Sequence, residues 1–326
     1  MPISRRQALQ VAAGAAALRA GFRPASARAY PSRPVRIVVG FAAGGPNDIL
    51  ARLIARWFAE HLGQPFVVEN RPGAGSNIAT EAIVRAAPDG SELLLVGSPN
   101  AVNATLYDNL KFDFVHDIAP VAGLMRGALI MVVSPTVPAT TLPEFIAYVK
   151  ANPGRLSYGS GGLGGITHIT AELFKQRAGN LQILHVPYRG VAPALADLLR
   201  GQVQVVFMNV LPSIGYIRSG ELRALGITTS MRSTVLPEVA PIGESVPGYE
   251  ASSFFGIGAP KRTPVEIIDL LNKEVGAALA DAEFEARIAA LGGHPLPGSP
   301  AAFGELIADE TRKWRTVIKV ADIKPL

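Results

Sequence analysis

Apolar residues occur along this chain in two alternating patterns. Short unbroken runs, such as residues 35–40 and 92–98, predict strands buried on both faces, whereas the spacing within 46–62 and 264–280 predicts amphipathic helices. Strands that alternate with helices in this way favour parallel sheets built from βαβ units. The predicted strands are 35–40, 65–70, 92–98, 127–134, 156–160, 183–188, 203–209, 222–228 and 252–259, and the predicted helices are 46–62, 76–87, 142–151, 166–177, 191–201, 213–219, 264–280, 282–291 and 300–319.

Two of these strands, 128–134 and 252–259, differ from the others because each is followed by proline and then by a new helical region. We interpret them as crossovers that carry the chain out of one domain and back again. The predicted fold class is therefore α/β, with two doubly wound α/β domains joined by two crossover strands and a ligand cleft between the domains. Domain 1 is predicted to comprise residues 30–130 plus 253–326, and domain 2 residues 131–252.

A glycine-rich turn follows the first strand and leads into a helix that opens with Pro46. Ala43, Gly44 and Gly45 leave this turn without side-chain bulk, so a ligand can approach the backbone closely. Pro46 suits the first helical position because its missing N–H is not needed there. The free N–H groups at this helix start favour a carboxylate or a phosphate.

Two further glycine-rich turns lie between a strand and a helix. The turn at 71–77 has Ser76 as a candidate N-cap. The turn at 157–165 matches G-x-G-x-x-G through Gly159, Gly161 and Gly164. A dinucleotide site needs an Asp or Glu roughly twenty residues further on to hold the ribose, and this chain has none there. The sequence therefore predicts an anion site without a cofactor.

Polar residues follow other predicted strands at their carboxyl ends, namely Ser98, Asn100, Tyr188 and Asn209. In open parallel sheets these ends line the ligand crevice. Asp48 leaves two interpretations open. Its carboxylate either interacts favourably with the helix dipole in the first turn or faces the cleft.

The candidate catalytic residues do not form a recognisable catalytic pattern. An exported hydrolase would use Ser160 as nucleophile and His168 as base, but the string YGSGG is not a G-x-S-x-G elbow and no acid is placed to orient the histidine. The other histidines lack ligand spacing, so no metal site is predicted. Paired carboxylates for acid–base chemistry are also missing from the pattern, which favours a binding protein with no catalytic residues over an enzyme.

Composition narrows the choice further. A chain of 326 residues with 48% hydrophobic residues has room for two cores. The net charge of +5 comes from residues 1–29, which hold five arginines and no acid. Residues 30–326 contain the other 26 of the 31 basic residues and all 26 acidic residues, so their charges balance. A neutral body without Lys/Arg clusters is not typical of proteins that bind nucleic acid. The absence of cysteine excludes disulfides and a thiol nucleophile.

Residues 1–29 have the pattern of an export signal. A twin arginine, Arg5-Arg6, precedes the apolar stretch 8–18, and small-x-small cleavage motifs follow at 25–29. The arginine pair is similar to that of a twin-arginine signal. We therefore expect a periplasmic protein that is soluble after cleavage of this segment.

A set of ordered motifs extends from Tyr30 to the C-terminus. The motifs are YPSRPVRIVVGFAAGGPNDILAR, VVENRPGAGSNIAT with AAPDG, LLLVGSPNAVNATLY, FDFVHDIAPVA, HVPYRGVAPALADLLRGQVQVVFMN and LPEVAPIGESVPGYEASSFFGIGAP. Their order and spacing resemble the substrate-binding receptors of tripartite tricarboxylate transporters, the Bug proteins. The resemblance implies a type II periplasmic binding protein fold, a small carboxylate or dicarboxylate ligand, and membrane subunits of such a transporter as partners of a monomer.

The resemblance also implies a set of ligand-binding residues. Met208 departs from the family pattern, which has an acid there, so either the ligand is less cationic or more apolar, or position 208 does not touch it. A ligand sensor for a two-component system would bind in the same way as a transport receptor, and genomic neighbours would separate the two. The implied residues are Phe41, Ala43, Gly44, Gly45 and Asp48 in the first loop, Gly75, Ser76 and Asn77 in the second, and Ser160, Thr167, His168 and Tyr188 in the second domain.

Overall fold

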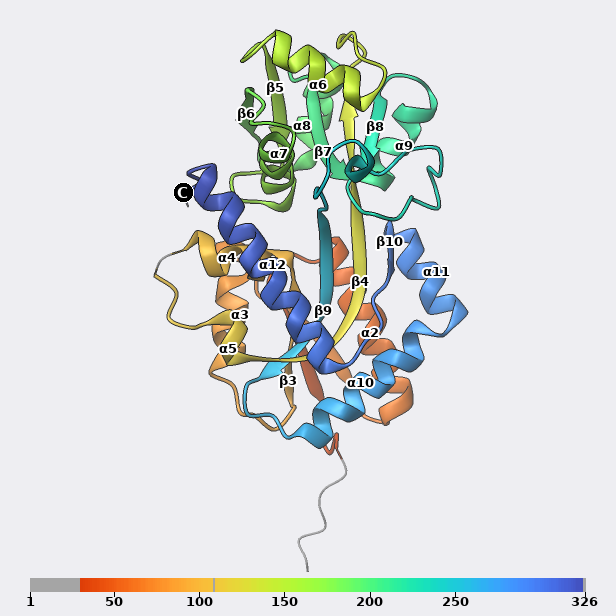
Figure 1. Cartoon of the computed structure of the whole chain (residues 1–326). Coiled ribbons are helices and arrows are strands. Elements are labelled where there is room, and N and C mark those ends of the chain that lie inside the picture. The colour runs from red at the N-terminus through yellow and green to blue at the C-terminus, as the bar shows by residue number, and fades with distance from the viewer. Residues whose placement is uncertain (1–29, 108, 325–326) are drawn as a thin grey trace, which may run out of the picture.

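The computed structural model of the chain describes residues 30–107 and 109–324 (Figure 1). The predicted export signal, residues 1–29, lies outside the described residues. Within the described ranges, no helix combines the length and the hydropathy that crossing a membrane requires.

The strands form one continuous sheet with two halves that meet at a long central strand, β4. Along the main path the order is β2-β1-β3-β9-β4-β7-β5-β6, and β8 and β10 also pair with β4. The strands are β1 (Val35–Val39), β2 (Phe66–Asn70), β3 (Glu92–Gly97), β4 (Ile118–Val133), β5 (Leu156–Ser160), β6 (Ile183–Pro187), β7 (Val205–Asn209), β8 (Arg223–Ile227), β9 (Ser252–Pro260) and β10 (Gly293–Pro295).

In the first half of the sheet, β1 pairs in parallel with β2 and β3, while β9 runs antiparallel to both β3 and β4. In the second half, β5 pairs in parallel with β6 and β7. Residues 118–128 of β4 pair with β9, and residues 129–133 pair with β7. The chain therefore crosses between the halves along β4 and returns along β9, as the predicted crossover strands require (Figure 1).

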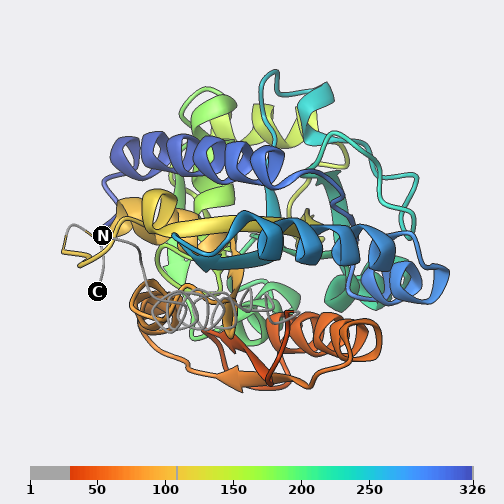
Figure 2. The ribbon, with the colours of Figure 1, turned by 90° about the horizontal axis from the view of Figure 1, so that it is seen from below.

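Helices cover both faces of the first half. Alternate residues of β1 point to opposite faces, so Ile37 packs with Leu50 of α2 and Leu271 of α10, whereas Val38 lies in another core cluster. That second cluster contains Ile83 of α3 and residues of the last helix, α12. Figure 2 shows α2 and α12 on opposite sides of the crossover strands. The helices are α2 (Pro46–Leu62), α3 (Asn77–Val84), α4 (Ser98–Leu106), α5 (Phe114–Asp117), α10 (Val265–Leu279), α11 (Ala282–Ala290) and α12 (Pro300–Val320).

The second half is doubly wound in the same manner. Phe207 of β7 packs with residues of α6 and α7 in one cluster, and its neighbour Met208 packs with residues of α8 and α9 in another. The prediction of a doubly wound α/β fold on both sides of the crossover is confirmed. These helices are α6 (Leu142–Ala151), α7 (Ile166–Arg177), α8 (Val191–Leu199) and α9 (Val210–Arg218).

Helix α12 contacts both halves. Its residue Phe303 is buried in a cluster of the first half, whereas Trp314 and Val317 are buried with Phe174 of α7 in the second half. In Figure 1, α12 runs diagonally from the first half up to α7. The whole helix falls in the segment predicted for domain 1, so its C-terminal turns connect that segment to the second half.

The structure corrects several of the predicted elements. β4 begins at Ile118 and has 16 residues, whereas only 127–134 was predicted, because Pro120 and Gly123 break the apolar pattern at two register shifts. The polar segment after β3 forms α4, and α5 and β10 were also missed. α9 begins at Val210, three residues earlier than predicted. The 3-10 turns η1 (Ala74–Ser76) and η2 (Ile242–Glu244) complete the fold.

Candidate functional site

A cavity of about 170 Å³ lies between the two halves of the molecule, against the crossover strands. Four helices begin at its wall, and each contributes a residue from its first turn or its N-cap position. The first-turn N–H groups of a helix have no partner within the helix, and the helix dipole places partial positive charge there. The lining residues at these helix starts are Pro46 and Asn47 of α2, Ser98 and Pro99 of α4, Ile166 of α7, and Asn209 before α9.

The halves also touch each other beside this cavity. Gly164 lies so close to Leu106 at the end of α4 that an added Cβ would be 2.4 Å from Leu106 Cδ2. On another edge, an added Cβ on Gly292 would be 3.4 Å from Leu211 Cγ of α9. The cavity therefore lies between two contacts that join the halves, that of Gly164 with Leu106 and that of Gly292 with Leu211.

Asp48 fixes the shape of the first loop. Its Oδ2 accepts hydrogen bonds from the Gly44 N–H and from Arg52 Nε, both at 2.9 Å, and its Oδ1 accepts from Asn70 Nδ2 at 3.0 Å. Asn70 also donates to the Phe41 carbonyl at 3.0 Å, which joins the loop to the end of β2. The Arg52 hydrogen bond, assisted by those of Gly44 and Asn70, lowers the pKa of Asp48 to about 2. The carboxylate is 3% exposed, and these internal bonds favour its structural interpretation.

The second loop is held to α4 by asparagine side chains. Asn103 Nδ2 donates to the Gly75 carbonyl at 2.7 Å and to Asn77 Oδ1 at 3.0 Å. Asn100 caps its own helix by accepting from the Gly97 N–H at 2.8 Å, and it donates to Thr80 Oγ1 at 2.8 Å. The polar side chains of this loop therefore bind one another and do not line the cavity.

Ser76 links the first two loops. It has φ +85°, a left-handed conformation that a residue with a Cβ seldom adopts, and it is 1% exposed. A Cβ added at Gly40, at the end of β1, would lie 2.0 Å from Ser76 Oγ. Gly40 is therefore required for the close approach of the second loop to the end of β1.

The third loop is held in a similar way by its own side chains. Thr167 Oγ1 accepts from the Gly161 N–H, and His168 Nδ1 accepts from the Gly164 N–H, both at 2.9 Å. These two side chains close the turn at the start of α7. Tyr188 hydroxyl donates to Asp197 Oδ2 at 2.8 Å, and burial together with this bond raises the pKa of Tyr188 to about 12.

The structure corrects the partner of Ser160. Its hydroxyl lies 2.7 Å from His185 Nε2, whereas the hydrolase interpretation paired it with His168. The His168 and His185 rings stack with centroids 3.8 Å apart, and Tyr158 stacks on His185 at 4.8 Å. Burial lowers the pKa of His168 to about 3 and that of His185 to about 4, so both rings are neutral near pH 7. Ser160 is fully buried, which keeps its hydroxyl from a substrate in this structure.

The cavity gathers only part of the predicted set. Phe41, Ser98 and Asn209 line it, and the remaining predicted residues act on the loops around it or lie outside its lining. Their contact with a ligand stays a prediction. Sequence reasoning missed several lining residues, and for those on the crossover strands no local signal exists, because their position depends on how β4 and β9 pair. The missed residues are Asn47, Pro99, Met125, Gly127, Ile166, Ser253, Phe255, Leu291 and Gly292.

Met208 does not face this cavity. Its side chain is fully buried and packs with Val206 and Ala194 in a core cluster of the second half, while the next residue, Asn209, lines the cavity. The replacement of the usual family acid at this position therefore changes a core residue outside the lining of this cavity.

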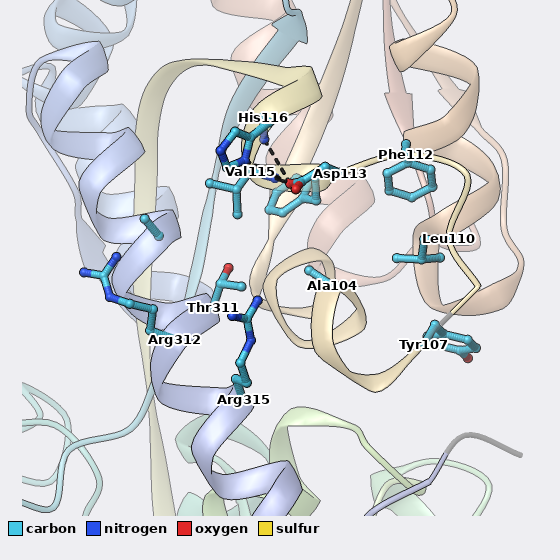
Figure 3. Close-up of a pocket in the computed structure, with 12 residues that line it drawn as sticks. Ala104, Tyr107, Leu110, Phe112, Asp113, Val115, His116, Thr311, Arg312 and Arg315 are labelled. Carbon is cyan, nitrogen blue, oxygen red and sulfur yellow. Dashed lines mark hydrogen bonds and ion pairs between the residues drawn. The ribbon is translucent and has the colours of Figure 1, made fainter.

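A larger cavity, of about 370 Å³, lies elsewhere, between α4, α5 and α12 (Figure 3). Arg312 and Arg315 extend from α12 on one side, and Asp113 and His116 lie on the other. Asp113 Oδ1 caps α5 and lies 3.2 Å from His116 Nδ1, and Arg312 pairs with Asp309. None of the predicted site residues lines this cavity.

A cavity enclosed between two doubly wound halves that are joined by two crossover strands defines the solute-binding receptors of the periplasmic binding protein class. The sequence profile described as "Tripartite tricarboxylate transporter family receptor" matches residues 50–323. The chain belongs to this receptor family.

Individual relatives agree with this assignment. Protein BugT of Bordetella pertussis is 38% identical over 304 residues, which cover 92% of this chain and 93% of BugT. A solved structure of an R. palustris protein with adipate has 36% identity and a TM-score of 0.77, and it covers 91% of this chain and 100% of that one. MatC from Rhodopseudomonas palustris with bound malate has 31% identity and a TM-score of 0.73, with coverage of 89% and 100%.

Proposed function

We propose that this receptor works in the periplasm, where it captures a small organic carboxylate for the membrane subunits of a tripartite tricarboxylate transporter. The observation that carries the proposal is the convergence of four helix starts on one cavity between the halves. Adipate in one relative and malate in another support a carboxylate as the class of ligand.

The proposed mechanism relies on backbone groups. The starts of α2 and α4 bring N–H donors and partial positive charge to the wall of the first half, so a carboxylate is held there without an arginine in the cavity lining. Closure of the halves removes water, which strengthens each of these bonds. The internal bonds of Asp48 hold the first loop in the geometry that binding needs.

The movement behind this closure follows the predicted domains. We propose that residues 131–252 move as one domain against 30–130 and 253–326, with β4 and β9 as the hinge. The Asn209 side chain makes no capping hydrogen bond at the start of α9, and Asn47 and Asn209 line the cavity from opposite halves. They are proposed to contact the ligand when the halves close.

The protein is proposed to be a monomeric binding protein and not an enzyme. The hydrogen bond between Ser160 and His185 is the kind that a hydrolase uses, but the serine is fully buried, and within residues 30–107 and 109–324 no carboxylate is hydrogen-bonded to the histidine. Ester or amide hydrolysis that Ser160→Ala abolishes would contradict this part of the proposal. Size-exclusion chromatography with light scattering measures the oligomeric state.

Isothermal titration against C4 to C8 carboxylates tests the receptor function. Gly45 has φ −82°, and a Cβ added there would meet only the Ala42 carbonyl oxygen, at an ordinary 3.8 Å, so Gly45→Phe fits the backbone but places a ring at the start of α2. We expect this variant to lose binding while its melting temperature stays close to that of the parent. Gly276→Phe, on the open side of α10, is the matched control and should bind normally. Failure of the parent protein to bind any carboxylate would refute the proposal.

A further inference from the structure

The walls of the cavity between the halves carry no charged side chain. Its lining, taken over the described residues, includes no Lys, Arg, His, Asp or Glu. Five of the lining residues are instead large and apolar. They are Phe41 of the first loop, Met125 of β4, Ile166 of α7, Phe255 of β9 and Leu291 after α11.

The polar side chains of the lining do not offset this apolar character. Ser98 Oγ accepts from the Phe254 N–H at 2.9 Å, and Ser253 Oγ donates to the Gly127 carbonyl at 3.3 Å, so both hydroxyls already bind the crossover strands. Asn47 and Asn209 present neutral amides. Asp48, in the first turn of α2, is outside the lining and is bonded to Arg52 and Asn70.

We infer that the ligand is a monocarboxylate with an apolar body, and that a second charged group is selected against. This inference rests on the proposed function, because it assumes that the helix starts hold one carboxylate. The body then lies against Phe41, Met125, Phe255 and Leu291, where burial of apolar surface is favourable.

The size of the cavity agrees with such a body. An apolar cavity of about 150 Å³ accommodates benzene, so the 170 Å³ found here has room for one six-membered ring or a chain of about six carbons. A charge at the far end of that body would lose its water among apolar side chains, and no oppositely charged side chain lines the cavity to replace it.

Three acids with the same six-carbon chain separate the possibilities. Hexanoate, adipate and 6-aminohexanoate share one carboxylate and differ at the far end, which is a methyl, a carboxylate or an ammonium group. In isothermal titration of the full protein at pH 7, we expect hexanoate to bind at least tenfold more tightly than either of the others. Adipate binding as tightly as hexanoate would overturn the inference, because the starts of α7 and α9 would then hold a second carboxylate. If neither these three acids nor any other carboxylate binds, the proposed function itself is refuted.

Variants in the apolar wall sharpen the test. Phe255→Ala should weaken hexanoate about tenfold, whereas Phe112→Ala, in the larger cavity beside α5, is the matched control and should leave the affinity unchanged. Leu291→Lys supplies the missing cation at a half-buried position, so it should reverse the preference toward adipate. An unchanged ratio of hexanoate to adipate affinity in a folded Leu291→Lys protein would also contradict the inference.

Discussion

Replacing Asp48 by Asn tests whether this residue holds the first loop or touches the ligand. The change keeps the size of the side chain but removes the charge. It also puts an amide N–H₂ where the carboxylate accepts hydrogen bonds, so one of the donors from Gly44, Arg52 or Asn70 loses its acceptor. Because all three partners belong to the protein, we expect the main effect to be on stability.

The size of this effect follows from the pKa of Asp48. A fall from 3.8 to about 2 corresponds to about 2.5 kcal/mol at 1.36 kcal/mol per unit. The Arg52 side chain is 55% exposed, so solvent screening reduces this figure, and we expect a loss of about 1 kcal/mol at pH 7. The folded-state pKa is lowered, so the stabilisation is complete above about pH 4 and disappears as the pH falls toward 2.

Urea unfolding of the parent and of Asp48→Asn at pH 7, 5, 4 and 3 measures this difference. We expect the gap in unfolding free energy to be constant between pH 7 and 5 and to narrow below pH 4. Glu60→Gln is the control on the same helix, because Glu60 pairs with Arg56 on the exposed surface and its loss should not be measurable. A gap that does not depend on pH, or loss of ligand binding at unchanged stability, would refute the structural role of Asp48.

Three other substitutions test packing and titration. Ser76→Gly should stabilise the protein by about 0.5 kcal/mol in urea unfolding, because glycine adopts φ +85° without the steric penalty; a destabilised variant would contradict this. Gly256→Ala should lower the melting temperature by several degrees, since the new Cβ would lie 2.2 Å from Phe303 Cζ, and an unchanged melting curve would disprove the close approach. The pKa values of His168 and His185 are lowered in the folded state, so below about pH 6.5 the unfolded chain binds more protons than the folded chain does. The free energy of unfolding should therefore fall from pH 6.5 toward pH 4. In His185→Gln the slope of this fall should decrease by up to about 1.4 kcal/mol per pH unit, and an identical slope would exclude His185 as its source.

The apolar pattern of the sequence was sufficient to predict both doubly wound halves and the two crossovers. It was insufficient where tertiary pairing decides the conformation. The first ten residues of β4 contain Pro120 and Gly123, which weaken any strand prediction, yet β9 supplies them with a pairing partner. α4 contains two asparagines and a threonine, which are weak helix formers, but Asn100 caps the helix and Asn103 ties it to the second loop.

The prediction of the site had a different weakness, which has a physical cause. Sequence reasoning selects polar side chains, because they are the visible candidates for ligand contact. In this fold the side chains of Asp48, Thr167 and His168 bind loop N–H groups and so fix the backbone around the cavity. The helix starts that face the cavity are backbone features, and any residue type except proline leaves its N–H group there without a helical partner. Two of the four helix starts at the cavity, those of α2 and α7, follow glycine-rich turns and so are visible in the sequence, whereas apolar lining residues such as Met125 and Phe255 are brought to the cavity only by the pairing of the crossover strands.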